Sequence, residues 1–104
     1  MTPRAIQRPA ARRDFVTHYL YLAEHAGLDV AKRFRGAVER TYQDLARMPE
    51  MGSGHKLREG RHAGIRLWPV RDFGNYWIAY HPHRDGIAVE RRFHAKQDFT
   101  RILR

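Results

Sequence analysis

The chain has 104 residues, of which 42% are hydrophobic and 12% aromatic, and a formal net charge of +9 at pH 7. This length allows one domain, residues 1–104, with one modest core. The absence of cysteine excludes disulfides and thiolate metal sites. No apolar run approaches the roughly 20 residues that span a bilayer, and the N-terminus lacks an apolar signal core, so we expect no membrane contact and a cytoplasmic location. So basic a domain is expected to bind an acidic partner, either nucleic acid or protein.

The first predicted elements are a short strand and a helix. Residues 3–8 can form an edge strand, which Pro3 and the neighbouring arginines protect from pairing with other chains. From residue 10 to residue 25 apolar residues recur at helical spacing, which predicts an amphipathic helix ended by Gly27. The expected apolar stripe consists of Phe15, Val16, Tyr19, Leu20, Leu22 and Ala23.

A second helix is predicted from Asp29, whose carboxylate can cap its first turn, to the residue before Pro49. Its buried face is expected to carry Phe34, Val38, Thr41, Leu45 and Met48. A tight turn at Gly27 makes the two helices an antiparallel hairpin. The following residues, 48–64, are glycine-rich and basic and are predicted to form the longest irregular segment.

The last third of the chain predicts a sheet. Three apolar runs, 65–70, 76–80 and 87–93, are separated by segments with turn residues, which is typical of an antiparallel meander. Residues 96–104 are expected to form a short closing helix. The predicted class is therefore α+β: an N-terminal edge strand, an antiparallel helical hairpin packed on a C-terminal antiparallel three-stranded meander, and a short C-terminal helix.

Several side chains of the predicted sheet could carry chemistry. A metal-independent ribonuclease needs a base, an acid and positive charge around the phosphate. The candidates are Arg66, Tyr80, Arg91 and His94. Arg91 and Arg92 are adjacent in a strand and therefore point to opposite faces, so at most one of them can join such a site. For His94 we favour the other interpretation, a structural histidine that bonds the backbone at the strand end.

Other residue types give weaker indications. His81 and His83 flank a proline, but spacing suggests no third ligand, so neither a metal nor a cofactor is expected. Aromatic residues in the strands could stack on the bases of single-stranded RNA. They are more often core residues and cross-strand pairs. The aromatic residues concerned are Trp68, Phe73, Tyr76, Trp77 and Tyr80.

Three segments of the chain resemble the RelE/ParE superfamily of type II toxin–antitoxin toxins, the ParE branch more closely than the RelE branch. The segment LARMPEMGSGHKLREG is similar to the family pattern L…P..G…..L..G. GIRLWPV…YWIAYHP is similar to lRvwpv…y.i.Y, and GIAVERRFHAKQD is similar to gveilRvlHgarD. Each pattern is loose, but their order and spacing over nearly the whole chain are fairly specific.

The resemblance implies a β-α-α-β-β-β fold and a small basic toxin that a cognate, acidic, ParD-like antitoxin neutralises, so that the two can form a hetero-oligomer. It also implies one of two activities. RelE-type members cut mRNA on the ribosome with basic residues and a C-terminal tyrosine. ParE-type members inhibit DNA gyrase by binding and have no known hydrolytic site.

Departures from the RelE pattern favour the ParE branch. Trp77 stands where the ribonucleases carry an arginine before the third-strand tyrosine, and Gln97 replaces a second arginine. Neither side chain supplies the charge that a phosphoryl transition state needs. Gln97 departs from the ParE pattern as well, and Arg92 occupies a position that is usually apolar. In place of the catalytic tyrosine of the last helix stand Phe99, Ile102 and Leu103.

We therefore expect a ParE-like toxin that acts by binding rather than catalysis. The antitoxin should lie across the hairpin and the sheet, with its acidic tail on Arg66, Arg91 and Arg92. The gyrase contact is expected in residues 96–104, at Lys96, Phe99 and Leu103; alternatively Phe99 and Leu103 only close the core. Two other functions stay open: a RelE-like mRNA interferase with a rearranged basic site at Arg66, Tyr80, Arg91 and His94, and a nucleic-acid-binding module without toxicity.

Overall fold

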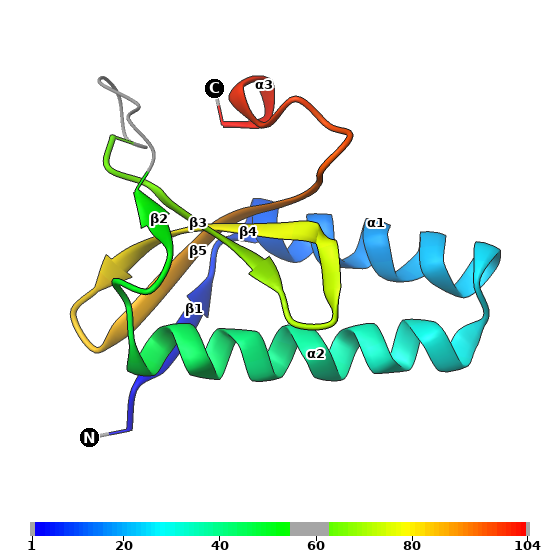
Figure 1. The fold of residues 1–104 in the computed structure, drawn as a ribbon, viewed down its shortest axis with the longest axis horizontal. Helices are drawn as coiled ribbons and strands as arrows, with labels where there is room; N and C mark the ends of the chain where they lie inside the picture. Colours follow the sequence, from blue (N-terminus) through cyan, green and yellow to red (C-terminus); the bar gives the residue numbers. More distant parts are fainter. Residues whose placement is uncertain (1, 55–62, 104) are drawn as a thin grey trace.

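The structure of the chain is a computed structural model, which describes residues 2–54 and 63–103. Residues 55–62 of the predicted irregular segment lie outside the described residues. The order of elements confirms the predicted α+β class and adds one short strand, β2 (Figure 1). The elements are β1 (Arg4–Gln7), α1 (Pro9–His25), α2 (Leu28–Arg47), β2 (Ser53–Gly54), β3 (Arg66–Val70), β4 (Phe73–His83), β5 (Gly86–His94) and α3 (Phe99–Ile102).

The strands form one mixed sheet of five strands in the order β1-β5-β4-β3-β2. The β3-β4-β5 meander is antiparallel, as predicted. The N-terminal strand β1 lies at the edge and pairs in parallel with β5, from Arg4 opposite Gly86 to Gln7 opposite Val89. A Cβ at Gly86 would overlap the Arg4 carbonyl oxygen, and φ of Gly86 is +153°, so only glycine fits where the two strands meet.

The sheet separates two apolar clusters. The hairpin of α1 and α2 covers one face, and α3 lies over the opposite face (Figure 1). On the hairpin side Tyr76, Ile78 and Tyr80 join the main cluster, whereas Ala79 joins the cluster beneath α3, with Trp77 packed against it. This confirms the alternation predicted for β4. The outer ends of both helices extend past the sheet (Figure 1).

Helix α2 buries one face against the sheet, and four of its five predicted stripe residues are buried: Phe34, Val38, Thr41 and Leu45. The Thr41 hydroxyl donates to the Ala37 carbonyl at 2.7 Å and accepts from the Arg71 amide at 3.0 Å, which satisfies a buried polar group. The prediction for Met48 was wrong. The helix ends at Arg47, and Met48 is 62% exposed.

Helix α1 differs more from its prediction. Its buried face carries Ala11 and His18, with Phe15 and Leu22 packed against the core. These positions follow the i, i+4, i+7 and i+11 spacing of one helix face. Val16 and Leu20, expected in the apolar stripe, are 50% and 59% exposed. The predicted apolar stripe therefore included one row of residues, Val16 and Leu20, that is exposed to solvent.

The start of α2 was also predicted incorrectly. The helix begins at Leu28, and its N-cap position is Gly27, with φ of +101°. Asp29 lies in the first turn, and no side chain caps the helix. A carboxylate in the first turn still interacts favourably with the helix dipole.

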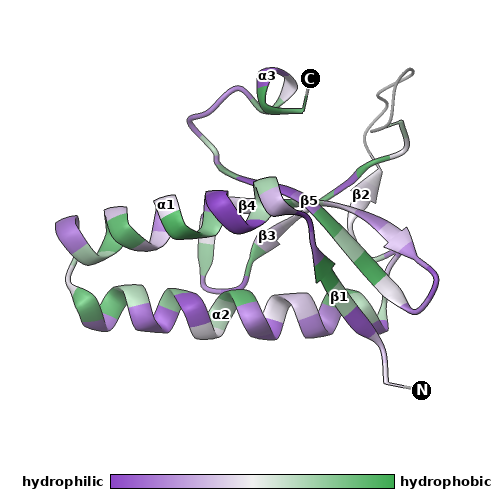
Figure 2. Cartoon of the chain, turned by 180° about the vertical axis from the view of Figure 1, so that it is seen from behind, coloured by the Kyte–Doolittle hydropathy of each residue, from purple (hydrophilic) through white to green (hydrophobic). Residues whose placement is uncertain are grey.

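Strand β4 is longer than predicted at both ends, and it includes Pro82 opposite Ile87. Its neighbour β3 pairs only as far as Arg66, which lies opposite Tyr80. Beyond that point one edge of β4 has no partner strand among the residues that the structure describes, and a residue without an amide hydrogen is tolerated at such an edge. In Figure 2 the β4–β5 connection is hydrophilic, as expected for an exposed turn.

A bulge in β5 decides which side chains enter the core. Ala79 pairs with Arg91 and Tyr80 pairs with Val89, so Glu90 is an extra residue. The bulge reverses the alternation, so that after Val89 it is Arg92 rather than Arg91 that faces the hairpin side. The predicted separation of the two arginines to opposite faces is confirmed, because Arg92 lies over the Phe15 ring.

Within the described residues, no helix is long and apolar enough to span a membrane.

Candidate functional site

Arg66 and Tyr80 lie opposite each other on β3 and β4, and both hold the segment that follows α2. The Tyr80 hydroxyl donates to the Pro49 carbonyl and accepts from the Gly52 amide, each at 2.8 Å. Arg66 Nη1 donates to the carbonyl oxygens of Glu50 and Gly52 at 3.2 and 2.7 Å. Burial raises the pKa of Tyr80 above its ordinary value. The two side chains thus shape the chain from residue 49 to residue 52.

Arg91 forms a junction between α1, β5 and α3. Its Nε and Nη2 donate to the two Asp14 carboxylate oxygens at 2.7 and 2.9 Å. Its Nη1 donates to the Ile102 carbonyl at 2.7 Å. The same carboxylate accepts from the Arg92 amide at 2.9 Å, beyond the point where β1 stops pairing with β5. The hydrogen bonds to Asp14 raise the pKa of Arg91, and each of the three guanidinium nitrogens donates one hydrogen bond.

Arg92, which the sequence placed in contact with an antitoxin, is 1% exposed. Its guanidinium carbon lies 4.9 Å from the Phe15 ring centroid and 5.2 Å from that of Phe34. Among the described residues, none of its three side-chain nitrogens has a hydrogen-bond partner. Burial lowers the pKa of Arg92. The guanidinium is therefore held by aromatic rings in the core and is not on the surface.

His94 lines a cavity of about 320 Å³ between α1 and the end of β5. The Lys96 amide donates to its Nδ1 at 3.1 Å, so the neutral ring carries its proton on Nε2. The ring packs edge-on against Tyr76, which packs edge-on against His18, with centroids 4.9 and 5.0 Å apart. We name this the histidine cavity; its lining is Thr17, His18, Tyr21, Tyr76, His94, Lys96 and Gln97.

His18 is the buried histidine of the histidine cavity. Burial, aided by the charge of Arg92, lowers the pKa of His18 to about 4, while Asp14 and a hydrogen bond to Gln97 partly oppose the shift. Its Nδ1 is buried and has no hydrogen-bond partner among the described residues. His18 is therefore neutral at pH 7 and keeps an unused polar atom.

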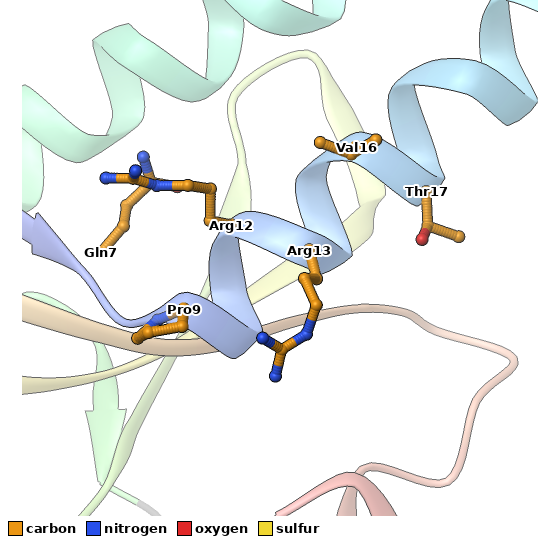
Figure 3. A pocket seen from close by; sticks show the side chains of 6 residues that line it. All are labelled: Gln7, Pro9, Arg12, Arg13, Val16 and Thr17. Atoms are coloured by element: carbon orange, nitrogen blue, oxygen red, sulfur yellow. The ribbon is translucent and has the colours of Figure 1, made fainter.

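A second concavity lies along the first turns of α1 (Figure 3). Its volume is about 660 Å³, and we name it the α1 groove. Pro9 and Val16 provide apolar surface, and the exposed Arg12 and Arg13 provide charge. Gln7 and Thr17 complete its lining.

The four candidate ribonuclease residues do not share one place. Arg66 and Tyr80 hold the 49–52 segment, Arg91 forms an ion pair beneath α3, and His94 lines the histidine cavity on the hairpin side. The aromatic residues of the strands do not form an exposed platform either, since Tyr76 and Tyr80 are buried. No group of three or more metal-ligating side chains was found in the part of the chain that the structure describes.

The predicted gyrase-contact residues lie in different surroundings. Lys96 is exposed. Phe99 stacks on Phe93 with centroids 5.6 Å apart, and Leu103 is buried in the cluster beneath α3. This placement fits the alternative that Phe99 and Leu103 close the core.

The sequence analysis did not identify Asp14 and His18 as important residues. A signal existed, because the two lie four residues apart and share a helix face with Ala11 and Leu22. Because Asp14 and His18 are polar, a stripe defined by apolar residues does not include them.

Comparison with known proteins identifies the family. The sequence model of the family described as the ParE toxin of the type II toxin–antitoxin system parDE matches residues 5–99. The chain belongs to the ParE toxin family. A ParD antitoxin is the partner that membership in a ParDE system implies. No match was found among curated protein sequences.

A solved structure supports the ParE fold. It is described as the chromosomal ParDE TA system from P. aeruginosa, and it superposes with a TM-score of 0.70 at 13% identity. The match covers 89% of this chain and 96% of that chain. At 13% identity the similarity shows the fold alone. The contacts described above therefore belong to this chain and are not transferred from the solved structure.

The two adjacent arginines should affect stability in opposite directions. Arg92→Met removes a buried charge that lacks hydrogen-bond partners and keeps an apolar side chain of similar length, so it should raise the free energy of unfolding by about 1–3 kcal/mol. Arg91→Met leaves Asp14 without its bidentate partner and should lower it by about 2 kcal/mol. Urea unfolding followed by circular dichroism measures both. If Arg92→Met lowers the free energy of unfolding as much as Arg91→Met does, the buried guanidinium stabilises the fold and the prediction is wrong.

His18 should make the fold sensitive to acid. Above pH 6.5 it is neutral in the folded and unfolded states; from pH 6.5 down to about 4 only the unfolded chain takes up a proton, so stability falls over this range. The loss is at most about 3 kcal/mol. Urea unfolding across this range should show a shallower dependence for His18→Gln than for the parent. The exposed His83→Gln is the matched control and should keep the parent slope.

Proposed function

We propose that this ParE family member inhibits DNA gyrase by binding it, without catalysis of its own. The family match over residues 5–99 carries the proposal. The scattered placement of Arg66, Tyr80, Arg91 and His94 supports it, because a phosphoryl transition state needs its base, acid and cations within hydrogen-bond reach of one phosphate. Each of these four side chains already has a structural partner.

The gyrase contact is proposed to lie on the segment from Lys96 to α3. Lys96 is exposed and offers a cation to an acidic surface. Phe99 and Leu103 pack against the sheet and support the segment from beneath. The Arg91–Ile102 hydrogen bond holds its end. In this proposal Lys96 contacts the target directly, whereas Phe99 and Leu103 do so only when α3 detaches.

The first test measures DNA damage and mRNA integrity in the same experiment. The chain is induced briefly in a bacterial host, and plasmid supercoiling, gyrase-linked DNA breaks and mRNA integrity are measured in the same culture. Gyrase inhibition predicts DNA breaks with intact mRNA. Lys96→Glu should reduce the DNA breaks by about tenfold, because a reversed charge at an interface is repelled. Lys32→Glu makes the same charge change on the exposed surface of α2 and should have no such effect.

The opposite pattern contradicts the proposal. Rapid mRNA cleavage with normal DNA would identify a ribonuclease whose basic site assembles in a different arrangement. Normal DNA and normal mRNA, together with salt-dependent binding to any nucleic acid, would favour a binding module without toxicity.

We also propose that the α1 groove and the exposed row beyond it receive the antitoxin. Val16 and Leu20 are half exposed and lie one turn apart, beside the exposed Arg12 and Arg13. An acidic segment with apolar residues complements such a surface. The acidic tail can continue from there to Arg91, whose side chain is 28% exposed. Arg66 remains in the proposal as a half-buried contact, and Arg92 would become accessible only if the hairpin moved.

The antitoxin surface can be tested by charge reversal. The double variant Arg12→Glu, Arg13→Glu should weaken binding of the purified cognate antitoxin by about a hundredfold, because two interface cations become repulsive. The double variant Arg33→Glu, Arg35→Glu changes the same charge on exposed positions of α2 and should weaken binding only slightly. Calorimetric titration measures both affinities. Equal losses in the two variants would mean that net charge alone attracts the antitoxin.

A further inference from the structure

We propose that the histidine cavity binds a nucleoside monophosphate, with the phosphate beside Lys96 and His94 and the base against Tyr21. This ligand goes beyond the proposed gyrase and antitoxin contacts, which involve macromolecules. The cavity of about 320 Å³ is at the small end of ligand pockets, which suits a single nucleotide rather than a helix or a folded segment.

Hydrogen-bond donors dominate the polar lining. Lys96 supplies an ammonium group, and His94 supplies Nε2–H because its Nδ1 accepts from the Lys96 amide. The side-chain Oε1 of Gln97 accepts from the His94 backbone amide at 2.7 Å, which fixes the Gln97 side chain at the cavity wall. The hydroxyl groups of Thr17, Tyr21 and Tyr76 can donate as well. Donors of this kind, arranged around one volume, recognise an oxyanion.

The charge around the cavity also favours an anion. None of the described residues that line it is acidic. Asp14, the carboxylate that acts on His18, is already bound by Arg91 and the Arg92 amide. Arg92 is close enough to act on both His18 and Tyr76, and its guanidinium has no hydrogen-bond partner among the described residues. The positive potential of the cavity is therefore not neutralised from within the described part of the chain.

Aromatic rings distinguish a nucleotide from a bare phosphate. Tyr21 lines the cavity, is 55% exposed, and packs against His25 in a tilted arrangement, with ring centroids 4.3 Å apart and ring planes at 35°. A base can stack on such an exposed ring at the mouth of the cavity. Deeper in, Tyr76 and the two histidine rings provide flat walls. His18 Nδ1, buried without a partner, is a further polar atom at the wall.

The test is a calorimetric titration of the full chain at physiological salt, without gyrase or antitoxin. Failure would therefore leave the gyrase proposal untouched. The probes are adenosine 5′-monophosphate, adenosine and inorganic phosphate. The nucleotide should bind about tenfold more tightly than adenosine or phosphate, because only the nucleotide uses both the donors and the exposed ring. A 5′-phosphorylated dinucleotide that binds more tightly still would point to the end of a nucleic-acid strand as the source.

Variants assign the binding to the cavity. Lys96→Gln should weaken the nucleotide about tenfold, and Lys32→Gln, which removes the same charge from α2, should change its affinity by less than about twofold. Tyr21→Ala should weaken the nucleotide and leave inorganic phosphate unchanged, because it removes the stacking surface alone. In nuclear magnetic resonance spectra the His94 ring signals should shift on nucleotide addition.

Several outcomes would overturn the proposal. Equal losses in Lys96→Gln and Lys32→Gln would mean that the nucleotide responds only to net charge. Phosphate that binds as tightly as the nucleotide would mean a simple anion site. A glutamate-rich peptide that binds through Lys96 while the nucleotide does not would assign the cavity to an acidic protein segment.

Discussion

The ion pair between Asp14 and Arg91 is the constraint on which the arrangement of the layers depends. One carboxylate on α1 binds the Arg91 guanidinium and the Arg92 amide, and the same guanidinium reaches the Ile102 carbonyl at the end of α3. The contact therefore joins the helical hairpin, the central sheet and the closing helix. It also satisfies the edge of β5 where β1 has ended. Charged hydrogen bonds of this type are short and directional, so they fix orientation as well as proximity.

The bulge at Glu90 makes this arrangement possible and has a cost. If β5 alternated regularly from Val89 through Glu90, Arg91 would face the hairpin and Arg92 would lie beneath α3. With it, Arg91 is free to meet Asp14 and Ile102, and Arg92 enters the core against two phenylalanine rings. A buried guanidinium without hydrogen bonds opposes folding, although cation–π contacts offset part of that cost. Burial lowers the pKa of His18, and the charge of Arg92 adds to this effect, so His18 stays neutral beside a positively charged core residue. One irregularity in a strand thus connects the stability of this chain to the character of its surface.

The polar side chains that could take part in catalysis are used for contacts within the chain. Arg66, Tyr80 and Arg91, the residues best suited to catalysis by type, hold backbone and carboxylate groups of the chain itself. Exposed cations lie elsewhere, and those on the first turns of α1, Arg12 and Arg13, stand beside the exposed Val16. Exposed cations beside exposed apolar residues are typical of a surface that binds a partner. The proposed function uses this distribution for binding, and the proposed nucleotide would use the donors of the histidine cavity.

The sequence by itself determined the class of fold, the order of elements, the core of α2 and the opposite directions of Arg91 and Arg92, because apolar periodicity and strand alternation are local properties. It also carried the family pattern. It did not determine which row of α1 is buried, since that row includes Asp14 and His18, whose partners lie far away in the sequence. Nor did it show that Tyr80 and Arg66 hold the 49–52 segment, or that Arg92 is inside. A one-residue bulge leaves no clear pattern in the strand, and ion pairs between distant elements have no sequence spacing. The bulge and these ion pairs are decided only when the hairpin packs on the sheet.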